Sequence, residues 1–184
     1  YTTTNRKRVF GVLLDAAPDA WGERVQLMAH ESSPKNELEK LIRLSGTGVG
    51  SIEFSLSQTR PKKPKPLPNI ELLDALSEAV EHIAENSALS KEELRLVEPG
   101  SSMGGARPKI TLTDEEGYAW LVKFSRGDDV ISYPKVEYAS MSLLAATGVN
   151  VPEVRLKRIS NGKYCYLIKR FDKEKNTGIH FISA

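Results

Sequence analysis

The chain has 184 residues, of which 40% are hydrophobic and 27% are charged. These fractions are close to the averages of globular domains, so they exclude a chain that is disordered throughout. The 26 basic and 24 acidic side chains leave a formal charge of only +2, which excludes a polycationic nucleic-acid-binding tail.

The low content of cysteine and histidine limits the chemistry further. Cys165 is the single cysteine and there are three histidines, which excludes an internal disulfide framework and a thiolate-rich zinc site. No apolar run approaches the roughly 20 residues of a membrane span, and residues 1–8 have no signal-peptide core behind their charges. We therefore predict a cytoplasmic protein with no membrane partner.

Helical signals come first along the chain. Apolar spacing after Pro18 predicts a helix over about 18–30. Ser33 and Pro34 suit the cap and first turn of a second helix, which we expect to end near Gly46. Residues 51–56 alternate between apolar and polar side chains, which predicts a short strand.

Residues 60–68, RPKKPKPLP, hold four prolines and four basic residues, so they are expected to form an extended, solvated connector. Contact with nucleic acid or an acidic partner is the alternative interpretation. From Asn69 onwards, apolar residues at helical spacing predict an amphipathic helix, namely Ile70, Leu73, Leu76, Val80 and Ile83. Ser90 and Glu93 have capping-box spacing, which predicts another short helix.

After residue 100 the pattern changes to strands, expected at 109–113, 119–124, 153–159 and 163–171. Asn161 and Gly162 predict a hairpin turn between the last two, because both residues tolerate positive φ. Pro134 begins a predicted helix that Gly148 can end. This order predicts an α+β fold, with a helical subdomain followed by a small lobe in which one helix packs on an antiparallel sheet.

The segment PGSSMGGARPK, residues 99–109, places several glycines and two serines directly before a strand. Glycines such as Gly104 and Gly105 let successive amide N–H groups approach a phosphate, and Arg107 and Lys109 supply positive charge. An ordinary turn is the alternative. The segment is neither a Walker loop nor a dinucleotide fingerprint, since no helix follows at the required spacing.

Lys123 ends the strand AWLVKF, whose alternation puts Lys123 on the same side as Leu121. A lysine beside an apolar neighbour needs a partner or must reach water. Glu137 lies in the first turn of the helix that Pro134 begins. A strand lysine paired with a helix glutamate beneath a glycine-rich loop is how kinase-like folds hold nucleotide phosphates. An exposed lysine and an unrelated surface glutamate are the alternative.

Six segments carry a family resemblance through their order and spacing: LLDAAPDAWGERV, SSMGGARPK, WLVKF, VEYASMSLLAATGVNVPEV, IKRFDKE and HFISA. Together they resemble the HipA family of serine/threonine-kinase-like toxins of bacterial toxin–antitoxin pairs. The resemblance covers nearly the whole chain. It is most specific over residues 100–172 and weakest over 60–98.

The resemblance implies an ATP-dependent kinase. Its glycine-rich loop would bind ATP through Ser102, Met103, Gly104, Gly105, Ala106, Arg107 and Lys109. Ser102 matches the family's autophosphorylated serine, with Ser101 as the neighbouring alternative. Phosphate there adds a charge of roughly −2 and could expel the loop from the nucleotide pocket, which would silence the enzyme. Arg107 and Pro108 replace the Gln and Glu of better-known members.

Three further matches concern the nucleotide. Lys123 matches the family's phosphate-contacting lysine and Glu137 matches its helix partner. Lys169, Arg170 and Phe171 match the hinge that lies beside adenine.

The resemblance also implies partners. Toxins of the family phosphorylate an aminoacyl-tRNA synthetase, which halts translation and favours dormancy. They are restrained by a HipB-like DNA-binding antitoxin, whose complex binds operator DNA. The catalytic aspartate and the Asp and Asn ligands of Mg²⁺ come from a helical lobe after the hinge. The chain begins at Tyr1 and stops at Ala184, so we expect a fragment without these groups that does not turn over alone.

We expect four parts: a portion of an amino-terminal subdomain (1–59), the connector (60–68), a helical segment (69–98) and a kinase-like small lobe (99–184). Two other functions remain open. One is a non-catalytic module that binds an antitoxin or DNA through the basic connector. The other is a small-molecule kinase, because a fold does not fix a substrate.

Overall fold

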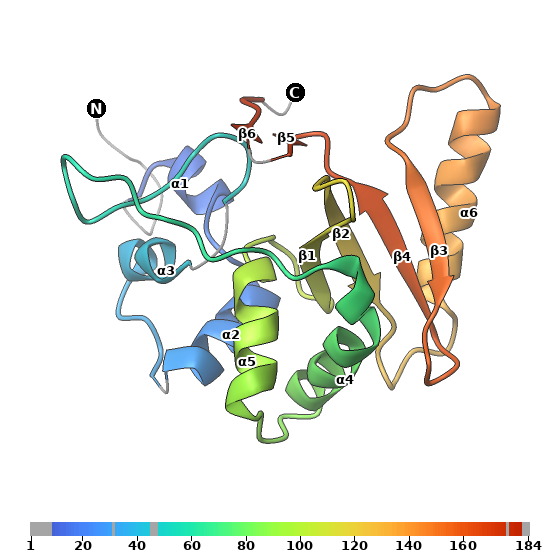
Figure 1. Ribbon diagram of the computed structural model, residues 1–184, viewed down its shortest axis with the longest axis horizontal. Coiled ribbons are helices and arrows are strands. Elements are labelled where there is room, and N and C mark those ends of the chain that lie inside the picture. Colours follow the sequence, from blue (N-terminus) through green and yellow to red (C-terminus); the bar gives the residue numbers. More distant parts are fainter. Residues whose placement is uncertain (1–8, 31, 45–47, 176, 182–184) are drawn as a thin grey trace.

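The computed structural model describes residues 9–30, 32–44, 48–175 and 177–181. Helices cover a four-stranded antiparallel sheet, as the α+β prediction requires. In Figure 1, α2, α4 and α5 gather on one side of the sheet, and α6 lies beside β3 and β4 on the other. The helices of the amino-terminal half are α1 (Gly11–Asp15), α2 (Ala20–His30), α3 (Glu37–Arg43), α4 (Leu73–Ala84) and α5 (Lys91–Val97), with short 3₁₀ turns at Ile70–Leu72 and Glu98–Gly100.

The first helices differ in detail from the sequence prediction. Helix α2 confirms the helix expected over 18–30, whereas α1 was not predicted. The cap expected at Ser33 and Pro34 is wrong: Asn36 caps α3, because its side chain accepts a hydrogen bond from the Glu39 amide at 2.9 Å. The stop expected near Gly46 lies outside the described residues.

Helices α4 and α5 form as predicted. Leu73, Leu76, Val80 and Ile83 are buried along one face of α4. Ser90 accepts a hydrogen bond from the Glu93 amide and the Glu93 side chain accepts one from the Ser90 amide, which completes the capping box of α5.

The strands are β1 (Lys109–Thr113), β2 (Ala119–Phe124), β3 (Val154–Arg158) and β4 (Tyr164–Lys169), in the sheet order β1-β2-β4-β3. Helix α6 (Tyr133–Ala146) packs on β3 and β4, and Gly148, at φ +87°, follows its end. The hairpin turn predicted at Asn161 and Gly162 joins β3 to β4, and of these two residues only Gly162 adopts positive φ. The short pair β5 (Lys173–Glu174) and β6 (Thr177–Gly178) was not predicted.

The two faces of the sheet have different surroundings. One face packs into the main core with α2, α4 and α5, through Ile110, Leu112, Trp120, Val122, Phe124, Cys165 and Leu167. Because residues directly opposite in antiparallel strands share a face, Lys109, Lys123 and Tyr166 lie together on the other face. The main core joins residues on both sides of the connector. Within the described residues, no helix is long and apolar enough to cross a membrane.

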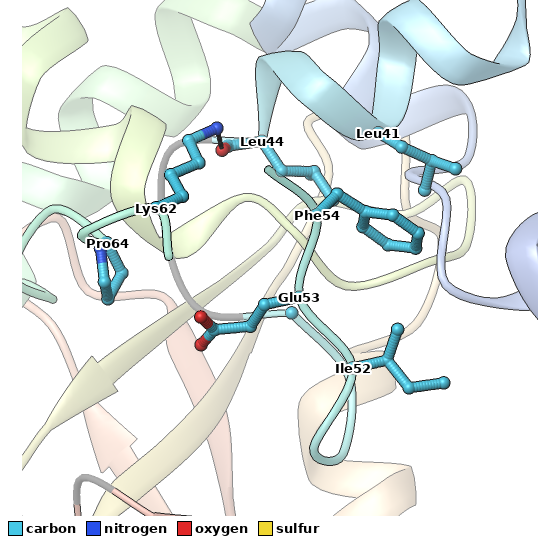
Figure 2. A pocket seen from close by; sticks show the side chains of 8 residues that line it. Leu41, Leu44, Ile52, Glu53, Phe54, Lys62 and Pro64 are labelled. Atoms are coloured by element: carbon cyan, nitrogen blue, oxygen red, sulfur yellow. Dashed lines mark hydrogen bonds between the residues drawn. The ribbon is translucent and has the colours of Figure 1, made fainter. Parts of the chain in front are cut away.

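The strand expected over 51–56 does not form. An alternating pattern makes a strand only when a neighbouring strand accepts its backbone hydrogen bonds, and this segment pairs with none. Phe54 instead packs near Leu41 in a small second core. These two side chains, drawn in Figure 2, line a cavity. Its volume is about 20 Å³. Such a space has room for about one water molecule, so it is a packing defect and not a ligand site.

A buried ionic cluster ties the loop 48–50 to the end of β4. Arg170, which is 5% exposed, donates to both carboxylate oxygens of Asp172, at 2.9 and 2.5 Å, and to Gly48 O at 3.2 Å. The Gly50 amide donates to Asp172 Oδ2 at 2.7 Å, and Lys173 Nζ donates to Gly50 O at 2.6 Å. Burial alone would raise the pKa of Asp172, but the Arg170 and Gly50 hydrogen bonds outweigh it and hold the pKa below 3.8.

This cluster predicts a pH-dependent loss of stability in Asp172→Asn. Removing one partner of a buried ion pair costs about 3–5 kcal/mol, so the free energy of unfolding should fall by about that amount near neutral pH. Because the folded-state pKa of Asp172 is lowered, its contribution is present above about pH 4 and is lost as the pH falls through the folded pKa. Urea unfolding at about pH 7 and about pH 2.5 should show the two proteins converging at low pH.

Asp128→Asn is the control, because the Asp128–Arg126 pair is exposed and should change stability little. Equal stability of the wild type and Asp172→Asn at neutral pH would contradict the role given to the cluster.

Candidate functional site

Lys123 and Glu137 form an ion pair where β2 ends and α6 begins. The distance from Lys123 Nζ to Glu137 Oε2 is 2.5 Å, and the side chains are 31% and 32% exposed. The pairing expected from the sequence is therefore present, and the alternative of two unrelated surface charges does not hold. The bond orients the lysine ammonium while water, or a ligand, can still reach it.

Lys109 places a second cation beside this pair. It lies directly opposite Lys123 in the β1–β2 register and is 7% exposed. Burial, followed by the charge of Lys123, lowers the pKa of Lys109. On the other side of Lys123, its Nζ lies 5.8 Å from the Tyr166 ring centroid. Two close cations, one buried and one partly buried, favour an anionic ligand.

The glycine-rich segment lies over Lys109. The ammonium of Lys109 donates to Gly104 O at 2.6 Å. The Gly105 amide donates to Asp19 Oδ2, in the residue before α2, at 2.7 Å. At the start of the segment, Gly100 packs so closely on β1 that a Cβ there would overlap the Thr111 carbonyl and the Ile110 side chain. The loop thus joins three parts of the molecule: α2, β1 and the cation pair.

Arg107 anchors the far end of the loop. Its Nη2 lies 2.5 Å from Asp129 Oδ2, and its guanidinium stacks 4.1 Å from the centroid of the Tyr133 ring. Burial opposes the charge on Asp129, but hydrogen bonds from Arg107 and the Arg126 amide outweigh it and lower the pKa of Asp129. The Arg107 side chain is therefore held at the connection between β2 and α6.

The other loop residues differ in exposure. Gly104 and Ala106 are exposed, and Met103 is half-buried. Ser101 and Ser102 are buried, at 5% and 2% exposure. A phosphoryl group can therefore reach Ser102 only if the loop moves.

The hinge residues lie at the end of β4 and do not direct their side chains together. Lys169 is opposite Trp120, on the sheet face away from Lys123, and its Nζ lies 3.6 Å from the Tyr118 ring centroid. Arg170 is held in the buried cluster with Asp172. Phe171 is 63% exposed. A cleft of about 430 Å³ borders the three residues. The groups that these residues can present to a planar ligand are their main-chain atoms and the Phe171 ring.

Asp19, Asp129 and Tyr133 are site contacts that the sequence reasoning missed. Asp19 lies 86 residues from the glycine whose amide it binds, and Asp129 lies 22 residues from Arg107. Contacts between residues so far apart leave no local spacing pattern in the sequence, so they could not be predicted from it.

The basic connector is partly committed to internal contacts. Lys62 donates to the Ile42 and Leu44 carbonyls at the end of α3, and Figure 2 shows its ammonium directed at the Leu44 oxygen. Lys65 Nζ lies 2.6 Å from Glu98. Two of its four basic side chains thus stabilise the fold. In the part of the chain that the structure describes, no group of three or more His, Cys, Asp or Glu side chains could hold a metal ion.

The comparisons with known proteins agree with this architecture. Residues 101–184 match the family model of the HipA-like C-terminal domain. The fold is similar to that of HipA in the Shewanella oneidensis MR-1 complex of HipA, HipB and operator DNA, with a TM-score of 0.57 and 19% sequence identity. The match covers 88% of this chain and 38% of that HipA chain, so the present chain spans well under half of its length. The comparison with curated proteins gave no match.

The tight packing of Gly100 predicts that Gly100→Ala destabilises the protein. The added methyl group would overlap the Thr111 carbonyl, so the junction between the 3₁₀ turn Glu98–Gly100 and β1 must shift, at a cost of about 1–3 kcal/mol. Urea unfolding measures the change. Gly127→Ala is the control, because nothing lies within 4 Å of a Cβ at Gly127. Equal stability of the two variants would show that the close approach of loop and strand is not a constraint.

Proposed function

We propose that the chain is the nucleotide-binding part of an ATP-dependent serine/threonine protein kinase, on the premise that residues 101–184 match the family model of the HipA-like C-terminal domain. The observation that carries the proposal is the Lys123–Glu137 ion pair beside Lys109 and beneath the glycine-rich segment. Phosphoryl transfer depends mainly on positioning and charge stabilisation, and this arrangement supplies both for phosphate groups.

Each residue of the site has a defined part in the proposal. Lys123 contacts the phosphates, and Glu137 holds its ammonium in place. Lys109 adds a second cation, and the Gly104–Gly105 peptide lies against it, with the Gly104 oxygen 2.6 Å from its ammonium. ATP supplies the phosphoryl group, with Mg²⁺ as its counterion. The described residues fit the phosphates but offer no metal-binding cluster, so we assign them no ligand of Mg²⁺.

The adenine ring would lie at the end of β4. The amides of Lys169 and Arg170 already donate to Glu153 O and Ala119 O, at 2.8 and 2.9 Å. Recognition of the base therefore falls to main-chain groups of the hinge other than these two amides, and to the exposed Phe171 ring. The cleft of about 430 Å³ beside these residues has the size expected of a small-ligand site.

Ser102 is the proposed regulatory site of autophosphorylation. Its side chain is 2% exposed, and a phosphate of roughly −2 charge cannot stay in such a place without new partners. Phosphorylation would therefore keep the loop out of its present position and reduce nucleotide binding.

The partners we propose follow the structural neighbour, a HipA that occurs with HipB and operator DNA. They are a HipB-like antitoxin and operator DNA through that complex. The family resemblance of the sequence adds a cytoplasmic protein substrate such as an aminoacyl-tRNA synthetase to this proposal. A non-catalytic module that binds DNA through residues 60–68 is the second candidate. The internal contacts of Lys62 and Lys65 leave it fewer free cations, so a flat salt dependence of DNA binding would eliminate it.

The proposal predicts that Lys123→Ala weakens ATP binding by about tenfold or more, which corresponds to about 1.4 kcal/mol. The reason is that the positive charge of the lysine would contact the phosphates directly. Calorimetric titration of the 184-residue chain measures the change in affinity. Lys157→Ala, an exposed lysine of β3, is the matched control and should bind ATP as the wild type does. ATP affinity that is the same in Lys123→Ala and the wild type would refute the proposed function.

A further inference from the structure

One peptide group of the glycine-rich segment is held at both ends. The C=O of Gly104 and the N–H of Gly105 belong to the same planar unit and point in opposite directions. The oxygen accepts from Lys109 Nζ at 2.6 Å, and the N–H donates to Asp19 Oδ2 at 2.7 Å. The orientation of this peptide is therefore fixed by a cation on one side and a carboxylate on the other.

This orientation opposes the binding of an anion. A phosphate needs N–H donors and free cations, but here the peptide turns its oxygen toward Lys109 and its N–H toward Asp19. The ammonium of Lys109, the neighbour of Lys123 in the sheet, is occupied by that oxygen. The same peptide thus removes one donor and engages one cation of the proposed phosphate site.

We propose that the Gly104–Gly105 peptide is a two-position switch, which Asp19 holds in the state of low anion affinity. A half-turn of the peptide would direct the Gly105 N–H toward Lys109, the register neighbour of Lys123, and release the Lys109 ammonium, so that the N–H and the ammonium both bind a phosphate group. Asp19 is then a positioning residue that acts through the loop. The inference rests on the proposed nucleotide site and adds its regulation.

The backbone allows the half-turn. Rotating a peptide group changes mainly ψ of the residue before it and φ of the residue after it, and both residues here are glycines. Gly105 has φ +107°, and a rotation of about 180° brings it to about −73°, which every residue type adopts. Gly104 is exposed and Gly105 is half-buried, so neither position is locked by surrounding core.

The hydrogen bond from the Gly105 amide to Asp19, which we call the latch, connects the loop to the amino-terminal helices. Asp19 directly precedes α2, and the Trp21 amide donates to Gly105 O at 3.3 Å. Trp21 itself is 2% exposed in the main core. A Cβ at Gly22 would lie 2.8 Å from Ser101 O, so α2 packs directly against the start of the loop. The switch therefore responds to whatever displaces α2.

Two variants that act by different routes test the switch. Asp19→Ala removes the acceptor of the Gly105 amide. Gly105→Ala leaves the charge unchanged, but alanine is strained at the positive φ of residue 105 and its methyl group would overlap Lys109 Nζ. The variant therefore favours the rotated peptide, in which residue 105 has a negative φ that alanine readily adopts. Both should bind tripolyphosphate and ATP about three- to tenfold more tightly than the wild type, by calorimetric titration.

Two controls separate the switch from simpler effects. Asp15→Ala removes another exposed carboxylate of the amino-terminal part and should leave anion affinity unchanged. Gly117→Ala imposes the same positive-φ strain at φ +85°, with open space around the Cβ, and should also leave it unchanged. Weaker or unchanged anion binding by Gly105→Ala would overturn the switch. Tighter binding by Asp19→Ala alone would reduce the effect to charge repulsion and also overturn it.

A readout without nucleotide tests the latch separately. Amide hydrogen exchange of residue 105, followed by NMR, should be slow in the wild type and several-fold faster in Asp19→Ala. Unchanged exchange would refute the latch, whatever the chain binds. If Lys123→Ala loses ATP binding while the Asp19 and Gly105 variants do not gain it, the switch fails and the proposed function stands. If no protein binds either anion, both fail.

Discussion

The candidate site depends on the β1–β2–β4 register, which sets Lys109, Lys123 and Tyr166 side by side on one face of the sheet. A slip of one residue would turn Lys123 into the main core, where Trp120 and Val122 now pack. The burial of those two side chains therefore fixes the lysine on the outer face. The Pro134 turn of α6 then brings Glu137 to within 2.5 Å of it. A hydrophobic constraint on one face thus determines the electrostatics of the other.

The amino-terminal part of the chain reaches both ends of this face. At one end Asp19 binds the Gly105 amide, and at the other the loop 48–50 binds Arg170 and Asp172 below the hinge. The first contact is exposed and the second is buried, so they differ in strength. The buried cluster acts as a fixed attachment, whereas the exposed contact can open at low cost. A change in the amino-terminal helices would therefore be transmitted to the glycine-rich loop more readily than to the hinge.

Elements whose signals are local could be predicted from the sequence. The capping box of α5, the apolar face of α4, the four strands and the Lys123–Glu137 pair all follow from spacing within about 15 residues, because caps, periodicity and strand-to-helix geometry act over that range. The expected strand over 51–56 failed because its pattern says nothing about a neighbouring strand. The Asp19 contact could not be found, since it joins residues 86 positions apart through an exposed side chain that shows no periodicity.

The balance of charge explains why the site should be selective for a strongly charged ligand. Each cation already has a partner: Lys109 binds Gly104 O, Lys123 binds Glu137, and Arg107 binds Asp129. A monoanion offers little more than those partners do, so it gains little by displacing them. A polyphosphate can contact several cations at once. After its first contact has formed, the later ones are intramolecular, so each internal ion pair can be displaced in turn. On the proposed function, the same internal pairs set a threshold of ligand charge, which we expect a nucleotide triphosphate to exceed and a single carboxylate not to reach.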